Sequence, residues 1–144
     1  MCEAGRDESG DRERLVLERT SHHVVLLNRY PYTNGHLMVA PLEHQEDPGS
    51  CSLEAQRELW PLLLRCREAL AAVYSPDGFN LGANLGSAAG AGVPGHFHVH
   101  LLPRWDGDTN FMSTVGGTRL VPEALDESWA RLRSRFRDIP AGGE

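Results

Sequence analysis

The chain has 144 residues, which is enough for one domain with a single buried core. Its 14 basic residues are all arginines, which excludes classes that depend on a lysine: P-loop nucleotide hydrolases, protein kinases and Schiff-base enzymes. The formal net charge of -6 excludes a broad nucleic-acid-binding surface, because such a surface needs clustered positive charge.

The cysteine content and the hydropathy pattern predict the compartment. The three cysteines are an odd number at irregular spacings, and no signal peptide is recognisable, so we expect a cytoplasmic protein. No apolar run approaches the roughly 20 residues that cross a bilayer, so we expect no membrane partner.

The first half of the chain predicts three antiparallel strands. Two β-rich runs, 15–17 and 24–27, read as a hairpin, and 35–41 reads as a third strand that ends at Pro41. The residues before the hairpin are polar and predict a flexible tail. The expected organisation is therefore a tail over 1–14, one domain over 15–137 and a second tail over 138–144.

A change to helical periodicity begins at Ser52, which is a candidate N-cap. The apolar residues recur at steps of three and four as far as Val73. Pro61 lies inside this pattern, so we expect a kink or two abutting helices there. The run from Ser75 to Gly78 predicts the end of the helix.

The second half of the chain predicts two more strands and a last helix. A strand over 79–85 should pair with a strand over 96–102, across a glycine-rich loop over 86–95 that is a candidate phosphate cradle. A helix should follow over 121–136. The expected fold class is α+β: an antiparallel sheet of about five strands with one long helix and a C-terminal helix.

Three histidines alternate along the last predicted strand: His96, His98 and His100. Side chains alternate between the faces of a strand, so all three imidazoles share one face while Phe97, Val99 and Leu101 point to the core. Imidazole can ligate a metal or act as nucleophile and acid near neutral pH. The residues alone leave both a metal site and phosphoryl chemistry open.

Residues 96–102 resemble the signature of the histidine triad superfamily, whose members hydrolyse or transfer nucleoside monophosphates. Residues 28–39 and 78–86 resemble further segments of that family. Residues 103–112 are similar to its bacterial diadenosine tetraphosphate phosphorylase branch. The resemblance covers about residues 13–136, with the segments in family order and spacing.

The resemblance implies a role for each histidine. His98 would attack the α-phosphorus and carry a covalent nucleotidyl group, with an N–H···O=C bond from its other ring nitrogen. His100 would donate a hydrogen bond to the phosphate or to the leaving oxygen. His96 and His36 would hold the catalytic strand.

The resemblance also implies the substrate contacts. Asn28 would bind the ribose hydroxyls, and Asn84 with the backbone of Gly90 and Gly92 would bind phosphate oxygens. From its position in the sequence, Arg104 follows the triad closely enough to raise the local potential for an incoming anion, and the segment that begins at Trp105 resembles the phosphorylase branch. We therefore expect these residues to lie around the nucleotide.

The resemblance therefore implies an enzyme that cleaves diadenosine tetraphosphate with phosphate as acceptor, releasing ATP and ADP, and that is a homodimer like its relatives. The alternatives are a hydrolase of dinucleoside polyphosphates or nucleoside phosphoramidates, and a non-catalytic protein that binds metal through the triad. We expect no protein-bound cofactor and no metal, with Mg²⁺ entering only with the nucleotide. Cys2 alone precedes the fold where relatives have two zinc-binding cysteines, so we expect no complete zinc site.

Overall fold

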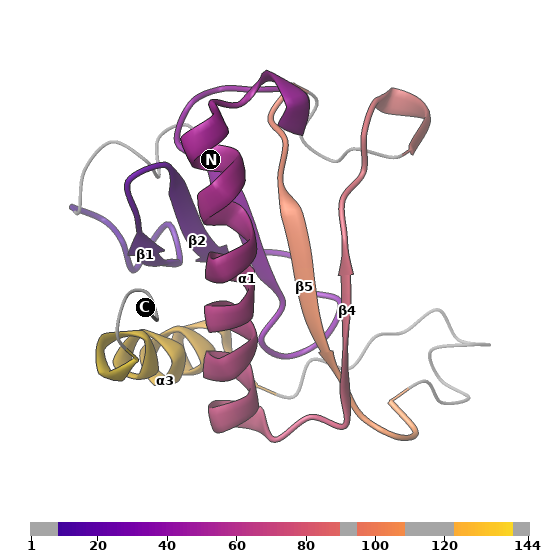
Figure 1. Cartoon of the computed structure of the whole chain (residues 1–144). Helices are drawn as coiled ribbons and strands as arrows, with labels where there is room; N and C mark the ends of the chain where they lie inside the picture. Colours follow the sequence, from indigo (N-terminus) through magenta and orange to yellow (C-terminus); the bar gives the residue numbers. More distant parts are fainter. Residues whose placement is uncertain (1–8, 90–94, 109–122, 140–144) are drawn as a thin grey trace.

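The computed structural model describes residues 9–89, 95–108 and 123–139, and these form one five-stranded antiparallel sheet with a long helix across one face (Figure 1). The sheet order is β1-β2-β3-β5-β4, so β3 is central and β4 is an end strand. The α+β class and the element content predicted from the sequence are confirmed. The strands are β1 (Val16–Arg19), β2 (His23–Leu27), β3 (Leu37–Pro41), β4 (Gly78–Gly82) and β5 (Val99–Arg104); the helices are α1 (Leu53–Tyr74) and α3 (Leu125–Asp138), with 3-10 turns at Pro48–Ser50 and Ser87–Ala89.

Helix α1 begins and ends where the sequence predicts. The side chain of Ser52 accepts a hydrogen bond from the backbone N–H of Ala55 at 3.2 Å, and Ser75 ends the helix in the left-handed region at φ 46°. Pro61 lies inside a single 22-residue helix, so the alternative of two abutting helices is wrong. Buried residues before and after Pro61 pack the same face of α1 onto the sheet, and this packing compensates for the lost hydrogen bond.

The sheet has two different faces. The face under α1 carries the main core, and Phe97, Val99 and Leu101 belong to it as the alternation predicts. The opposite face carries a smaller buried cluster that includes Met38. In the register, Met38 is paired with His100, which places the triad histidines on the face away from α1.

The folded part of the chain begins earlier than the predicted boundary at Leu15. Residues 9–14 form turns, and Asp11 is only 8% exposed. Its carboxylate accepts two hydrogen bonds from Arg19, at 2.6 and 3.0 Å. The polar composition of this segment indicated a tail, but a charge paired across β1 makes part of it structural.

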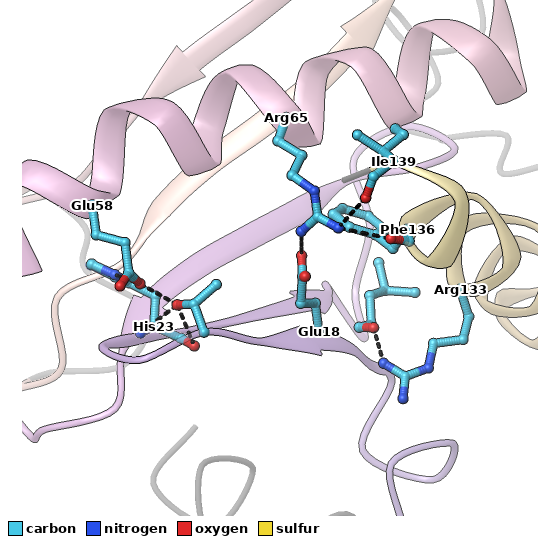
Figure 2. A network of polar contacts seen from close by, with 9 residues as sticks. Glu18, His23, Glu58, Arg65, Arg133, Phe136 and Ile139 are labelled. Atoms are coloured by element: carbon cyan, nitrogen blue, oxygen red, sulfur yellow. Dashed lines mark hydrogen bonds and ion pairs between the residues drawn. The ribbon is translucent and has the colours of Figure 1, made fainter. Parts of the chain in front are cut away.

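Polar contacts fix both helices to the edge of the sheet (Figure 2). Arg65 of α1 forms an ion pair with Glu18 of β1 and donates to the backbone oxygens of Phe136 and Ile139, at 2.7 and 2.8 Å. It therefore ties β1, α1 and the end of α3 together. Nearer the start of α1, Glu58 accepts from His23 Nδ1 at 3.1 Å, and burial lowers the pKa of that histidine.

Neither helix of the described part of the chain has the length and apolar content that crossing a bilayer requires.

Candidate active site

The middle histidine of the triad is held in one tautomer by the chain itself. His98 Nδ1 lies 2.9 Å from the backbone oxygen of His96, and a carbonyl oxygen can only accept. Nδ1 therefore carries the proton, and Nε2 keeps its lone pair. His98 is 6% exposed, so few alternative rotamers fit the site. The N–H···O=C bond expected for His98 is therefore present, and the lone pair on its Nε2 atom can act as a nucleophile.

His36 and His100 meet on the same face of the sheet. His36 directly precedes β3 and is completely buried, and its Nε2 atom lies 2.8 Å from Nδ1 of His100 in β5. The rings of His98 and His100 have centroids 4.7 Å apart, edge to face. Burial, and secondarily the neighbouring His98, lower the pKa of His100, which favours a neutral imidazole at pH 7. The structure thus brings three of the four predicted histidines into contact.

His96 is the first residue of the histidine segment (residues 96–100) and supports its backbone. Its Nε2 atom donates to the backbone oxygen of Pro41, the last residue of β3, at 2.9 Å. Burial is the largest cause that lowers its pKa. His96 and His98 precede β5, whose ladder starts at Val99, so this hydrogen bond holds an extended segment that has no ladder bonds of its own.

The predicted substrate contacts divide into two groups. Asn28, half-buried, lies beside His36, with its Nδ2 atom 3.5 Å from His36 Nδ1. Asn84 is exposed and lies two residues beyond the end of β4, whose last ladder pair is Gly82 with His100. Gly90 and Gly92 lie outside the described residues.

Arg104 and Trp105 form a second group, away from the histidines. The Arg104 guanidinium binds Asp108 through two nitrogens at 2.5 and 2.7 Å and Asn80 at 2.6 Å, and the hydrogen bonds to Asp108 raise its pKa. The Trp105 ring packs edge to face on Tyr74 at the end of α1. Both residues stabilise the turn that follows β5, and neither is placed on the histidine cluster.

Comparisons with known proteins identify the family. The model of the HIT domain family matches residues 10–107. The chain belongs to the histidine triad (HIT) family. An AP-4-A phosphorylase from Mycobacterium tuberculosis is 37% identical over 130 residues, which are 90% of this chain and 67% of that protein.

Solved structures share the HIT fold. A zinc-bound histidine triad family protein from Mycobacterium smegmatis superposes with a TM-score of 0.74 at 27% identity, covering 95% of this chain and 91% of that one. A diadenosine triphosphate hydrolase from Plasmodium falciparum gives a TM-score of 0.67 at 17% identity, covering 88% and 78% of the two chains. The second likeness concerns the fold alone.

The described residues of this HIT protein do not assemble a zinc site. The rings of His44 and His96 have centroids 5.0 Å apart, but His96 Nε2 is engaged by Pro41. Across residues 9–89, 95–108 and 123–139, no group of three or more His, Cys, Asp or Glu side chains is arranged to hold a metal ion. Cys2 lies outside these ranges. The described residues alone therefore do not supply the three or four ligands that a zinc site requires.

Tyr32 lies in the loop before β3 and was not among the site residues predicted from the sequence. The Tyr32 ring lies 4.9 Å from the His36 ring and 6.5 Å from the His100 ring, measured between centroids. Its backbone N–H donates to His36 Nδ1 at 3.2 Å. A tyrosine four residues before a histidine carries no recognised signal, so only the folded loop shows this contact.

Proposed function

We propose that this HIT protein transfers a nucleotidyl group through His98 and cleaves dinucleoside polyphosphates, with diadenosine tetraphosphate as substrate and inorganic phosphate as acceptor. The observation that carries the proposal is the bond from His98 Nδ1 to the His96 carbonyl, because it leaves a lone pair on Nε2 beside His100. The likeness to a mycobacterial AP-4-A phosphorylase supports the choice of substrate and acceptor.

The reaction balances in two displacements. His98 Nε2 forms a bond to the α-phosphorus, the bond from that phosphorus to the bridging oxygen breaks, and ATP leaves with the electron pair. The ring then bears a positive charge, which the His96 carbonyl stabilises through Nδ1–H. A phosphate oxygen next attacks the same phosphorus, the N–P bond breaks, and ADP leaves with neutral His98 restored.

Labelled phosphate tests the acceptor. With diadenosine tetraphosphate and millimolar radiolabelled phosphate, we expect ATP and ADP in equal amounts, with the label in the terminal phosphate of ADP. Products of ATP and AMP that do not respond to phosphate would instead establish the hydrolase alternative with the same histidines. Stoichiometric metal bound to the triad, without turnover of any dinucleotide, would favour the metal-binding alternative.

We also propose that the enzyme is a homodimer, with a second copy of the chain covering the outer face of α1. Leu53, Trp60 and Leu64 follow one another along this face, and Trp60 is 59% exposed. Leu81 of β4 is exposed on the same side of the sheet, since it is paired with the core residue Leu101. As the end strand, β4 can pair antiparallel with its own copy about a twofold axis (Figure 1).

The charges beside this apolar face suit an antiparallel copy. Arg57 and Glu68 are exposed on the same side of α1, in its first and second halves. In a second copy whose α1 runs antiparallel to this one, each residue would therefore face the opposite charge.

We expect the wild-type chain to have a dimer's mass in light scattering at micromolar concentration. Trp60→Glu with Leu64→Glu should give a folded monomer. A monomeric wild type would contradict the proposal.

A further inference from the structure

We infer that the loop at residues 28–32 fixes the proton of His100 on its Nε2 atom, acting through His36. The loop supplies two donors, the backbone N–H of Tyr32 and the side-chain amide of Asn28, so both are positioning groups. The inference deepens the proposed function, on which it rests, because it states which atom of His100 faces the nucleotide with a proton.

The hydrogen bonds to His36 determine its tautomer. The backbone N–H of Tyr32, which can only donate, lies 3.2 Å from His36 Nδ1. Asn28 adds a weaker contact, since its Nδ2 atom is 3.5 Å from the same nitrogen. The Asn28 amide is oriented by the Tyr30 N–H, which donates to Asn28 Oδ1 at 2.9 Å. Two donors therefore converge on His36 Nδ1, which must accept.

The tautomer of His36 determines the tautomer of His100. A neutral imidazole whose Nδ1 accepts carries its proton on Nε2. His36 Nε2 lies 2.8 Å from His100 Nδ1, so His36 donates and His100 accepts. The remaining proton of neutral His100 is then on Nε2. Because His36 is completely buried, water does not readily replace either partner of this chain of hydrogen bonds.

The rings of His98 and His100 differ in the nitrogen that carries the proton. The His96 carbonyl holds the proton of His98 on Nδ1, while the loop holds the proton of His100 on Nε2. The two rings, with centroids 4.7 Å apart, are thus in opposite tautomers. Nε2 of His98 presents a lone pair to the phosphorus, and Nε2 of His100 presents a hydrogen-bond donor.

This arrangement matches the reaction that we propose. The oxygen that leaves becomes a terminal phosphate oxygen of ATP, and phosphate monoesters lose their second proton near pH 6, so a hydrogen bond suffices and no proton need be transferred. Because a neutral His100 only donates a hydrogen bond, it keeps its proton and can act in both displacements without being reprotonated between them. Burial, which lowers the pKa of His100, maintains this neutral form at pH 7.

The test replaces His36 by two side chains that equal each other in length, one of which can donate a hydrogen bond to His100 while the other can only accept one. In His36→Gln, the amide can donate to His100 Nδ1 as the imidazole does. In His36→Glu, the carboxylate can only accept and will draw a proton onto His100 Nδ1. Long-range nitrogen NMR reports the tautomer of His100 directly, and His22→Gln, a histidine in the turn between β1 and β2, is the matched control.

We expect neutral His100 to be protonated on Nε2 in the wild type, in His36→Gln and in His22→Gln. His36→Glu should move the proton to Nδ1 or give the doubly protonated ring. It should also lower kcat at least about 100-fold relative to His36→Gln, with a smaller change in KM. A wild-type His100 protonated on Nδ1, or equal tautomers and rates in the Gln and Glu variants, would overturn the inference.

The NMR result separates this inference from the proposed function. If the wild type shows the expected tautomer but cleaves no dinucleotide, the proposed function fails and the inference about His100 stands. If the wild type is active and His100 is protonated on Nδ1, the inference fails alone. Because the wild-type spectrum decides this point, the test does not depend on whether the His36 variants fold.

Discussion

The His98→Ala protein is expected to turn over diadenosine tetraphosphate at least about 1000-fold more slowly than the wild type, because the variant lacks the imidazole on which we propose that the covalent intermediate forms. Nucleotide affinity should change by less than about tenfold, since the ring acts chiefly in the transition state. Steady-state kinetics and equilibrium binding measure the two effects. His22→Ala should keep wild-type turnover. A His98→Ala protein with more than a few per cent of wild-type turnover would contradict the assignment.

The covalent intermediate can be tested by comparing the wild type with His98→Ala. When a substrate labelled in adenine is mixed with enzyme in the absence of phosphate and quenched in alkali, the wild-type chain should retain the label. Acid should release it, because an N–P bond to imidazole is labile in acid. Denatured His98→Ala should retain none. Retention by the variant would place the nucleophile on another residue.

Local patterns in the sequence predicted most of the fold. The alternation at residues 96–101 correctly placed Phe97, Val99 and Leu101 in the core, because a strand has a period of two whatever lies beside it. The cap at Ser52 and the break at Ser75 correctly bounded α1, since both depend on neighbours within four residues. Each of these features is determined by residues that are close together in the sequence.

Features that depend on distant partners were not predictable in the same way. The histidine segment joins the ladder only at Val99, because the Phe97 N–H donates to the Gln45 backbone oxygen at 2.6 Å. Arg104 looked available to an anion beside the triad, but Asp108 and Asn80 bind it. The chain from Tyr32 through His36 to His100 joins a loop to β5, and no spacing in the sequence indicates it.

Gly35 connects the stability of the fold to the geometry of the site. It lies between the loop and His36, and its φ of 70° is strained for any residue with a side chain. A Cβ atom there would lie 2.7 Å from Tyr74 Cε2 and 2.9 Å from Leu70 Cδ2, both in the last turns of α1. The close approach of the loop to α1 therefore requires a glycine at this position.

We expect Gly35→Ala to lower the free energy of unfolding by about 2–4 kcal/mol, the sum of about 1–2 kcal/mol of backbone strain and about 1–3 kcal/mol of overpacking, less some relaxation. Thermal and urea unfolding measure this loss.

Two other glycines separate the two causes of this loss. Gly86 has a φ of 78° but open space around its Cβ position, so Gly86→Ala should show the backbone strain alone. Gly82 has neither constraint, so Gly82→Ala should change stability by less than about 1 kcal/mol. If Gly35→Ala is no more destabilising than Gly86→Ala, the contact with α1 does not constrain the loop. If the contact does constrain it, Gly35→Ala should also lower kcat in the fraction that stays folded, because a shift of the loop lengthens the 2.8 Å bond from His36 to His100.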